Sequence, residues 1–198
     1  MNQPGIAQLT KDIRACRICA EHLPHGPRPV FTAGAQSRIV IIGQAPGRRV
    51  HESGVPWRDQ SGDNLRAWLG VDGKTFYDTA HFALMPMGFC YPGAGESGDL
   101  PPRPECAPLW HPQLLAKLKS VKLTLLIGQY AQAHYLGDRA FETLTETVRH
   151  FRAYCPQYFP LPHPSPRNRL WLRRNPWFEV ELLPALREKV HRLIETKS

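Results

Sequence analysis

Four short apolar runs, separated by segments with helical periodicity, constrain the fold of this chain more than any other feature. The expected strands cover residues 38–42, 81–85, 122–127 and 157–161. The expected helices cover residues 60–69, 111–118, 130–136 and 140–151, and a last helix is indicated by the helical spacing of Leu183, Leu186, Val190 and Leu193. Strands that alternate with helices predict a parallel sheet covered by helices on both faces.

The length and composition fit one folded domain, which we expect to span residues 1–198. Hydrophobic residues make up 42% and charged residues 21% of the chain, as in ordinary globular proteins. No apolar run approaches the ~20 residues that a membrane span needs. The N-terminal sequence MNQPGIAQLTKDIRAC is too polar for a secretory signal, so we expect a cytoplasmic protein with no membrane partner.

An excess of positive charge favours a polyanionic partner. Lys and Arg number 25 against 17 Asp and Glu, which gives a formal net charge of +8. Near the C-terminal end, arginines are interleaved with tryptophans at Arg167, Arg169, Trp171, Arg173, Arg174 and Trp177. Arginines can contact phosphates and flat rings can stack on bases, so this stretch predicts a nucleic-acid surface. Trp177 begins an amphipathic helix and is expected to be a core residue instead. Net charge alone does not exclude a basic protein that has no such partner.

Two short loops follow expected strands and combine residues suited to catalysis. The first is GQAPG at residues 43–47, and the second is HPSPRN at residues 163–168. Ligands of open α/β sheets bind outside the carboxyl ends of the strands, so these loops are expected to face one cleft. The first would bring backbone amides and an amide side chain, and the second a histidine and an arginine.

Four of the five cysteines are spaced as ligands of one centre. Cys16 and Cys19 form a C-x2-C pair, while Cys90 and Cys106 stand near the ends of a Gly- and Pro-rich loop at residues 91–108. A loop of this length without regular structure is usually functional or held by a constraint. The spacing fits a structural zinc, an iron–sulfur cluster or, without metal, reduced cysteines. Cys155 has no partner in this scheme and is expected to be a buried small residue.

Taken together, these motifs resemble the uracil-DNA glycosylase superfamily over most of the chain. GQAPG is similar to the family's first motif, and HPSPRN is similar to the second motif of its single-strand-selective monofunctional branch. The cysteine spacing resembles that of the iron–sulfur branch. The resemblance implies a three-layer α/β/α sandwich around a four-stranded parallel sheet, with Cys16, Cys19, Cys90 and Cys106 as ligands of a [4Fe–4S] cluster.

The resemblance also implies hydrolysis of the N-glycosidic bond of a damaged base that has been flipped out of DNA. His163 corresponds to the histidine that donates a hydrogen bond to the carbonyl oxygen of the departing base. Trp57 stands where relatives place an aromatic ring that stacks on this base, although a core tryptophan is an equal interpretation. Arg167 would enter the space that the base vacates, and Ser165 would hold a flanking phosphate.

The remaining expected contacts come from the two motifs themselves. Gln44 and the backbone around it would contact the base edge or position water. The residues expected to bind substrate in this way are Ala45, Pro46, Gly47 and Asn168. The implied partner is DNA that contains a damaged base, and we expect the protein to act as a monomer.

Two departures from the family pattern concern the reaction and its substrate. The most active relatives carry an acid in the first motif, whereas Gln44 and Ala45 stand there and neither is a base. Asp59 is the leading substitute, although it is also suited to cap the helix that begins near residue 60; Asp63 and Glu52 are weaker candidates.

The asparagine that reads uracil in the iron–sulfur branch falls at Pro86, which has neither an amide side chain nor an N–H donor. Recognition would then come from Gln44, Gln129 or backbone groups. The leading hypothesis is a glycosylase for uracil or another deaminated base. The alternatives are a catalytically weak or inactive DNA-binding member of the superfamily and an enzyme that acts on free nucleosides.

Overall fold

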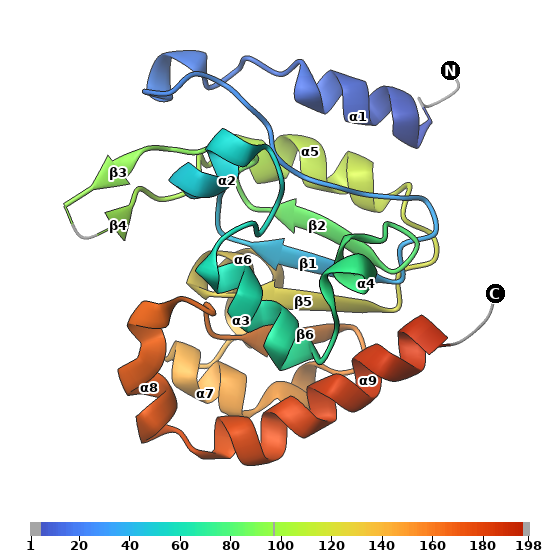
Figure 1. Ribbon diagram of the computed structural model, residues 1–198, viewed down its shortest axis with the longest axis vertical. Coiled ribbons are helices and arrows are strands. Elements are labelled where there is room, and N and C mark those ends of the chain that lie inside the picture. Colours follow the sequence, from blue (N-terminus) through green and yellow to red (C-terminus); the bar gives the residue numbers. More distant parts are fainter. Residues whose placement is uncertain (1–4, 97, 196–198) are drawn as a thin grey trace.

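A computed structural model, which describes residues 5–96 and 98–195, contains a parallel four-stranded sheet at its centre. Its strands are β1 (Ile39–Gly43), β2 (Phe82–Pro86), β5 (Leu123–Ile127) and β6 (Tyr158–Leu161), in the order β2-β1-β5-β6. All three strand pairs are parallel, and each expected strand is present within one residue of its predicted bounds. Their carboxyl ends lie at one edge of the sheet, on the left of Figure 1.

Alternate residues of the strands pack into two separate cores. In β1, Ile39 and Ile41 belong to one hydrophobic cluster, while Val40 and Ile42 belong to the other. This alternation follows from the period of two residues along a strand. Because both faces are apolar, the sheet is covered on both sides, and the three-layer sandwich predicted from the sequence is confirmed.

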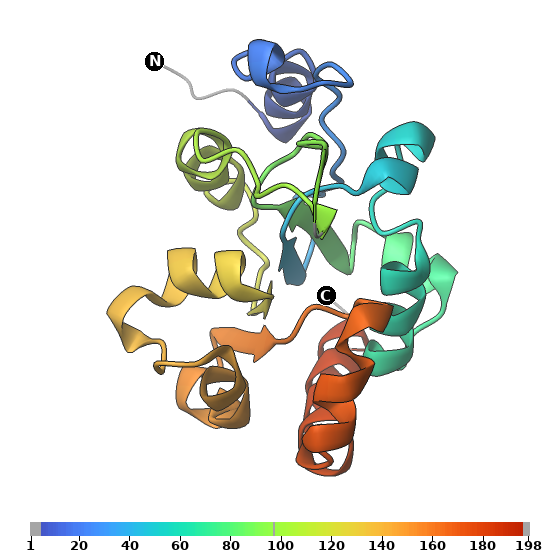
Figure 2. The ribbon, with the colours of Figure 1, turned by 90° about the vertical axis from the view of Figure 1, so that its left-hand side faces the viewer.

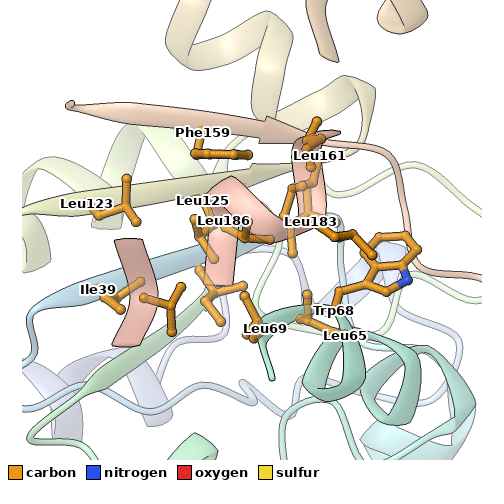
Figure 3. Packing of buried hydrophobic residues seen from close by; sticks show 14 of the residues in the cluster. Ile39, Leu65, Trp68, Leu69, Leu123, Leu125, Phe159, Leu161, Leu183 and Leu186 are labelled. Atoms are coloured by element: carbon orange, nitrogen blue, oxygen red, sulfur yellow. The ribbon is translucent and has the colours of Figure 1, made fainter. Parts of the chain in front are cut away.

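Helices from different parts of the chain cover the two faces. Helices α3 (Gln60–Leu69) and α9 (Leu183–Glu195) pack on the first face, and Figure 3 shows Leu65, Leu69 and Leu186 against the strand residues there. Helices α1 (Ile6–Arg14), α5 (Cys106–Leu115) and α6 (Gln129–Leu136) cover the second face. Figure 2, viewed toward the carboxyl ends of the strands, shows these helices arranged around the sheet.

Shorter elements complete the described chain. The remaining helices are α2 (Arg48–Ser53), α4 (Gly73–Tyr77), α7 (Leu144–Arg149) and α8 (Arg169–Arg174). Single helical turns are η1 (Ala20–His22), η2 (Gly137–Arg139), η3 (Phe151–Tyr154), η4 (Pro166–Asn168) and η5 (Phe178–Leu182). The domain expected over residues 1–198 includes residues 1–4, 97 and 196–198, which lie outside the described residues. Within the described part, no helix has the length and apolarity to cross a bilayer.

Several predicted boundaries were wrong for local reasons. The helix expected at 111–118 is α5, which begins at Cys106 because Pro108 falls in the first turn, where no backbone donor is needed. The helix expected at 140–151 is shorter, because the Thr143 hydroxyl accepts from the Glu146 amide and caps α7. The loop at 91–108 contains a small antiparallel hairpin of β3 (Ala94–Gly95) and β4 (Gly98–Asp99).

Candidate active site

A cleft of about 460 Å³ opens at the carboxyl ends of the strands. It is formed by the loop after β1, the turn before α3, the end of β2, the β3–β4 hairpin and the loop after β6. Both sequence motifs therefore face one cavity. All ten residues that the sequence marks for catalysis or substrate binding line it: Gln44, Ala45, Pro46, Gly47, Trp57, Asp59, His163, Ser165, Arg167 and Asn168.

Hydrogen bonds hold the HPSPRN loop in one conformation. The Asn168 amide donates to the His163 carbonyl oxygen at 2.7 Å, and the Asn64 amide donates to the Pro164 carbonyl oxygen at 2.8 Å. The Ser165 hydroxyl accepts from the Arg167 amide at 3.3 Å and caps η4. Asn168, which was expected to contact substrate, therefore also helps to position His163. Asn64 fixes the same loop, and the sequence did not indicate this role.

The His163 imidazole is half-buried between the sheet and Trp57. Its ring centroid lies 5.9 Å from that of Trp57, with the planes tilted by 31°. Desolvation lowers the pKa of His163 below its usual value, and the nearby Asp59 carboxylate partly opposes this shift. The ring is therefore neutral at physiological pH and can donate one hydrogen bond without carrying charge.

Trp57 is held in a strained backbone conformation at the cleft wall. It is the single non-glycine residue of the described chain with a positive φ, at 57°. A Cβ on Gly43 would lie 2.7 Å from the Trp57 ring, and a Cβ on Gly62 would lie 1.7 Å from the Trp57 carbonyl oxygen. That oxygen also accepts from Arg66 and Tyr77, each at 3.4 Å. Two glycines and two hydrogen-bond donors thus fix the place of this half-buried ring.

Asp59 both lines the cleft and caps a helix. Its Oδ1 accepts from the Gly62 amide at 2.9 Å, which makes Asp59 the N-cap of α3. The prediction that Asp59 caps this helix is therefore confirmed. The two weaker acidic candidates do not line the cleft: Asp63 pairs with Arg66 on α3, and Glu52 belongs to α2.

A second carboxylate, which the sequence did not indicate, lies at the mouth of the cleft. Asp99, on β4, is solvent-exposed, and its Oδ2 is 3.2 Å from the position that a Cβ on Gly47 would take. Partial desolvation of its carboxylate at the cleft raises the pKa of Asp99, an effect that the Tyr91 hydroxyl and Arg167 partly oppose. Arg167 itself lies against the backbone of Gly98 on the same hairpin.

Pro86 closes the cleft at the end of β2 and offers it no hydrogen-bond donor. Its carbonyl oxygen lies 3.0 Å from Nε2 of His111, whose Nδ1 is 2.6 Å from the Tyr135 hydroxyl. Burial lowers the pKa of His111 to about 4 and raises that of Tyr135. This buried pair fixes the strand end. Gln129, the other amide proposed to read the base, begins α6 and does not line the cleft.

Beside the cleft, the arginine-rich stretch forms α8, whose arginines and tryptophan lie in different surroundings. Arg169, Arg173 and Arg174 are exposed, whereas Trp171 packs against the first core and donates to the Thr145 hydroxyl at 2.8 Å. The arginines can therefore reach phosphates. Trp171 is only partly buried there, so the prediction that its ring offers a stacking surface for bases stays a prediction.

The four cysteines expected to share a centre line one small cavity, away from the active-site cleft. Cys16 and Cys19 lie just after α1, Cys90 follows β2, and Cys106 begins α5. Burial raises the pKa of Cys90 to about 11 and that of Cys106 to about 12. Within the described ranges, no three His, Cys, Asp or Glu side chains are spaced to hold a single metal ion.

The cavity walls are apolar, with side chains of Ile13, Leu23, Phe89 and Trp110. Four thiols in an apolar pocket are a donor set that fits a thiolate-bound group. Cys155 lies elsewhere and packs against the first core, where it is partly buried and not fully buried as expected.

A comparison with protein families agrees with the geometry of the cleft. The model of the uracil DNA glycosylase superfamily matches residues 30–187, which include every residue that lines the cleft. Cys16 and Cys19 precede the matched segment, while Cys90 and Cys106 lie within it. The match covers well over half of the chain, which therefore belongs to the uracil-DNA glycosylase superfamily.

Proposed function

We propose that this protein is a DNA glycosylase that hydrolyses the N-glycosidic bond of uracil or another deaminated base after flipping the nucleotide into the cleft. The observation that carries this proposal is the meeting of His163, Trp57 and the GQAPG loop around one cavity of about 460 Å³. Enzymes that act on a base within DNA must take it out of the stack, which requires a pocket of this kind.

His163 and Trp57 would serve the two ends of the flipped base. The Trp57 ring, fixed by its contacts with Gly43 and Gly62, offers a flat surface for stacking. The neutral His163 ring can donate to the base carbonyl oxygen, where negative charge develops as the bond breaks. A fixed donor of this kind stabilises the transition state more than the ground state.

Recognition of the base edge would fall to Gln44, because Pro86 presents no donor. The Gln44 side chain lines the cleft, and its backbone carbonyl is held by the Gly88 amide at 3.0 Å. A carboxamide can donate and accept, so it can pair with uracil and also with the keto edges of hypoxanthine or xanthine. We therefore expect activity on more than one deaminated base.

The exposed arginines of α8 would bind the DNA backbone beside the cleft. Arg169, Arg173 and Arg174 stand on the helix that continues the HPSPRN loop, next to Ser165 and Arg167 at the cleft. Contacts of this kind position the duplex without reading its sequence.

We further propose that Cys16, Cys19, Cys90 and Cys106 hold a [4Fe–4S] cluster. The supporting observation is their shared apolar pocket, whose four thiols are a donor set typical of such clusters. Bonds between the four thiolates and the cluster would join the segment after α1 to the segment after β2 and to the start of α5. No step of the base-release chemistry is assigned to it.

The test is an excision assay on oligonucleotides that contain uracil, hypoxanthine or xanthine. We expect base release by the wild-type protein and a loss of about 10²–10³-fold in rate for His163→Ala. His150→Ala, which removes an exposed histidine outside the cleft, is the control and should keep the wild-type rate. No release from any of the three substrates by the cluster-loaded protein would refute the proposal.

A DNA-binding role without catalysis is the second candidate, favoured by the neutral side chains of Gln44 and Ala45 in the first motif. Tight binding of DNA without base release, unchanged by His163→Ala, would support it.

A further inference from the structure

We propose that Asp99 supplies the carboxylate that activates water and stabilises the cationic sugar in this cleft. The inference rests on the proposed glycosylase function and names a residue outside both sequence motifs. Asp99 reaches the cleft from the β3–β4 hairpin, more than fifty residues after GQAPG in the chain.

The position of Asp99 suits a group that acts on the sugar. Its Oδ2 lies against the backbone of Gly47, so a carboxylate oxygen stands beside the GQAPG loop. Gly47 has no side chain to separate them: a Cβ there would be 3.2 Å from this oxygen. The carboxylate thereby supplies the negative charge that the side chains of this loop lack.

Asp59, the other carboxylate along the cleft, has a different set of contacts. Its Oδ1 is held by the Gly62 amide at the start of α3, and its charge acts on His163. Asp99 accepts from the Tyr91 hydroxyl and faces Arg167 and Arg48, with Asp59 as the like charge that opposes its ionisation. Tyr91 is buried, so the hydroxyl that holds the carboxylate belongs to the protein interior, while Asp99 itself lines the cleft.

In the proposed step, the bond between the sugar C1′ and the base nitrogen breaks, and its electron pair leaves with the base. The carbonyl oxygen of that base accepts the hydrogen bond from His163. A water molecule forms the new bond to C1′, and its proton passes to the Asp99 carboxylate. The products are the free base, after it takes up a proton, and an abasic site in the DNA. Removal of a general base typically costs about 10²–10⁴-fold in rate.

The deciding experiment measures binding of two abasic-site analogues in the same duplex. One carries a pyrrolidine ring, whose protonated nitrogen mimics the cationic sugar, and the other carries neutral tetrahydrofuran. We expect the wild-type protein to prefer the cation by at least about ten-fold. Asp99→Asn, which can still accept from the Tyr91 hydroxyl, should lose that preference and also release base about 10²-fold more slowly.

Two control variants separate this role from others. Glu96→Gln removes one negative charge from the same hairpin outside the cleft and should retain the preference. Tyr91→Phe removes the hydrogen bond to Asp99 but keeps the carboxylate, so it should retain most of the preference; a loss equal to that of Asp99→Asn would indicate a merely structural role and overturn the inference. So would an undiminished preference in Asp99→Asn. The two proposals can also fail separately. If Asp99→Asn loses the preference but the wild-type protein releases no base from any substrate, the contact of Asp99 with the cationic sugar is supported and the glycosylase function is refuted.

Discussion

Gly43 is the residue whose substitution most directly tests how the cleft holds Trp57. In Gly43→Ala, the added Cβ would lie 2.7 Å from Cζ2 of the tryptophan ring. Carbon atoms pack at about 3.5–4.0 Å, so the ring must move by about 1 Å. Its backbone cannot follow easily, because Gly62 and two hydrogen bonds to the carbonyl oxygen hold it.

A displacement of about 1 Å in a positioning group costs about 10²-fold in rate. We therefore expect Gly43→Ala to slow base release by about this factor in single-turnover assays. Overpacking of this kind costs about 1–3 kcal/mol of stability, or a few degrees in Tm, so the variant should still fold. Gly73→Ala, where a Cβ would meet nothing within 4 Å, is the matched control.

The double variant Gly43→Ala with Trp57→Phe identifies the cause. A smaller ring relieves the contact, so the double variant should release base no more slowly than Trp57→Phe alone. A Gly43→Ala variant with wild-type kinetics, or an equal further loss in the Phe background, would show that the contact between Gly43 and the ring does not position the base.

Three further predictions use other parts of the chain. Burial lowers the pKa of His111 to about 4, so between pH 6.5 and 4 this histidine is protonated in the unfolded chain but not in the folded protein. Over this range the free energy of unfolding, measured by chemical denaturation, should fall by about 3 kcal/mol more for the wild-type protein than for His111→Asn. An equal dependence of the free energy of unfolding on pH in both proteins would contradict this. Cys106→Ser should lose iron and visible absorption, whereas Cys155→Ser keeps both; a colourless wild-type protein with bound zinc would favour the zinc alternative. Replacing Arg173 and Arg174 by glutamine should reduce the salt dependence of DNA binding by about one unit for each lost phosphate contact, and an unchanged slope would remove α8 from the interface.

The sequence predicts the sheet better than it predicts the helix ends. The apolar residues of β1 and β5 are buried on both faces, a pattern that leaves few other folds for the chain. The bounds of α5 depend on where Pro108 falls within the first helical turn, which no apolar periodicity reveals. Likewise, the two-residue strands of the β3–β4 hairpin are too short to show any alternation.

The candidate site likewise contains residues that the sequence predicts and residues that only the structure reveals. GQAPG and HPSPRN each follow a strand, so the sequence predicts that both lie at the carboxyl edge of the sheet. Asp99 and Asn64 could not be found this way, because their places depend on contacts with residues about fifty and one hundred positions away. The strain at Trp57 was also hidden, since only the folded chain shows that Gly43 and Gly62 leave room for it.

The packing of α1 has a consequence for the order in which the chain folds. Leu9 and Ile13 are buried in the second core, and α1 packs against α5, which begins almost one hundred residues later. During synthesis α1 emerges long before α5 exists. Contacts between such distant segments form slowly, because a long loop must close first. We expect pulse-labelling hydrogen exchange to show α1 protected after the sheet, so that a helix made well before its partner docks only after the strands have paired.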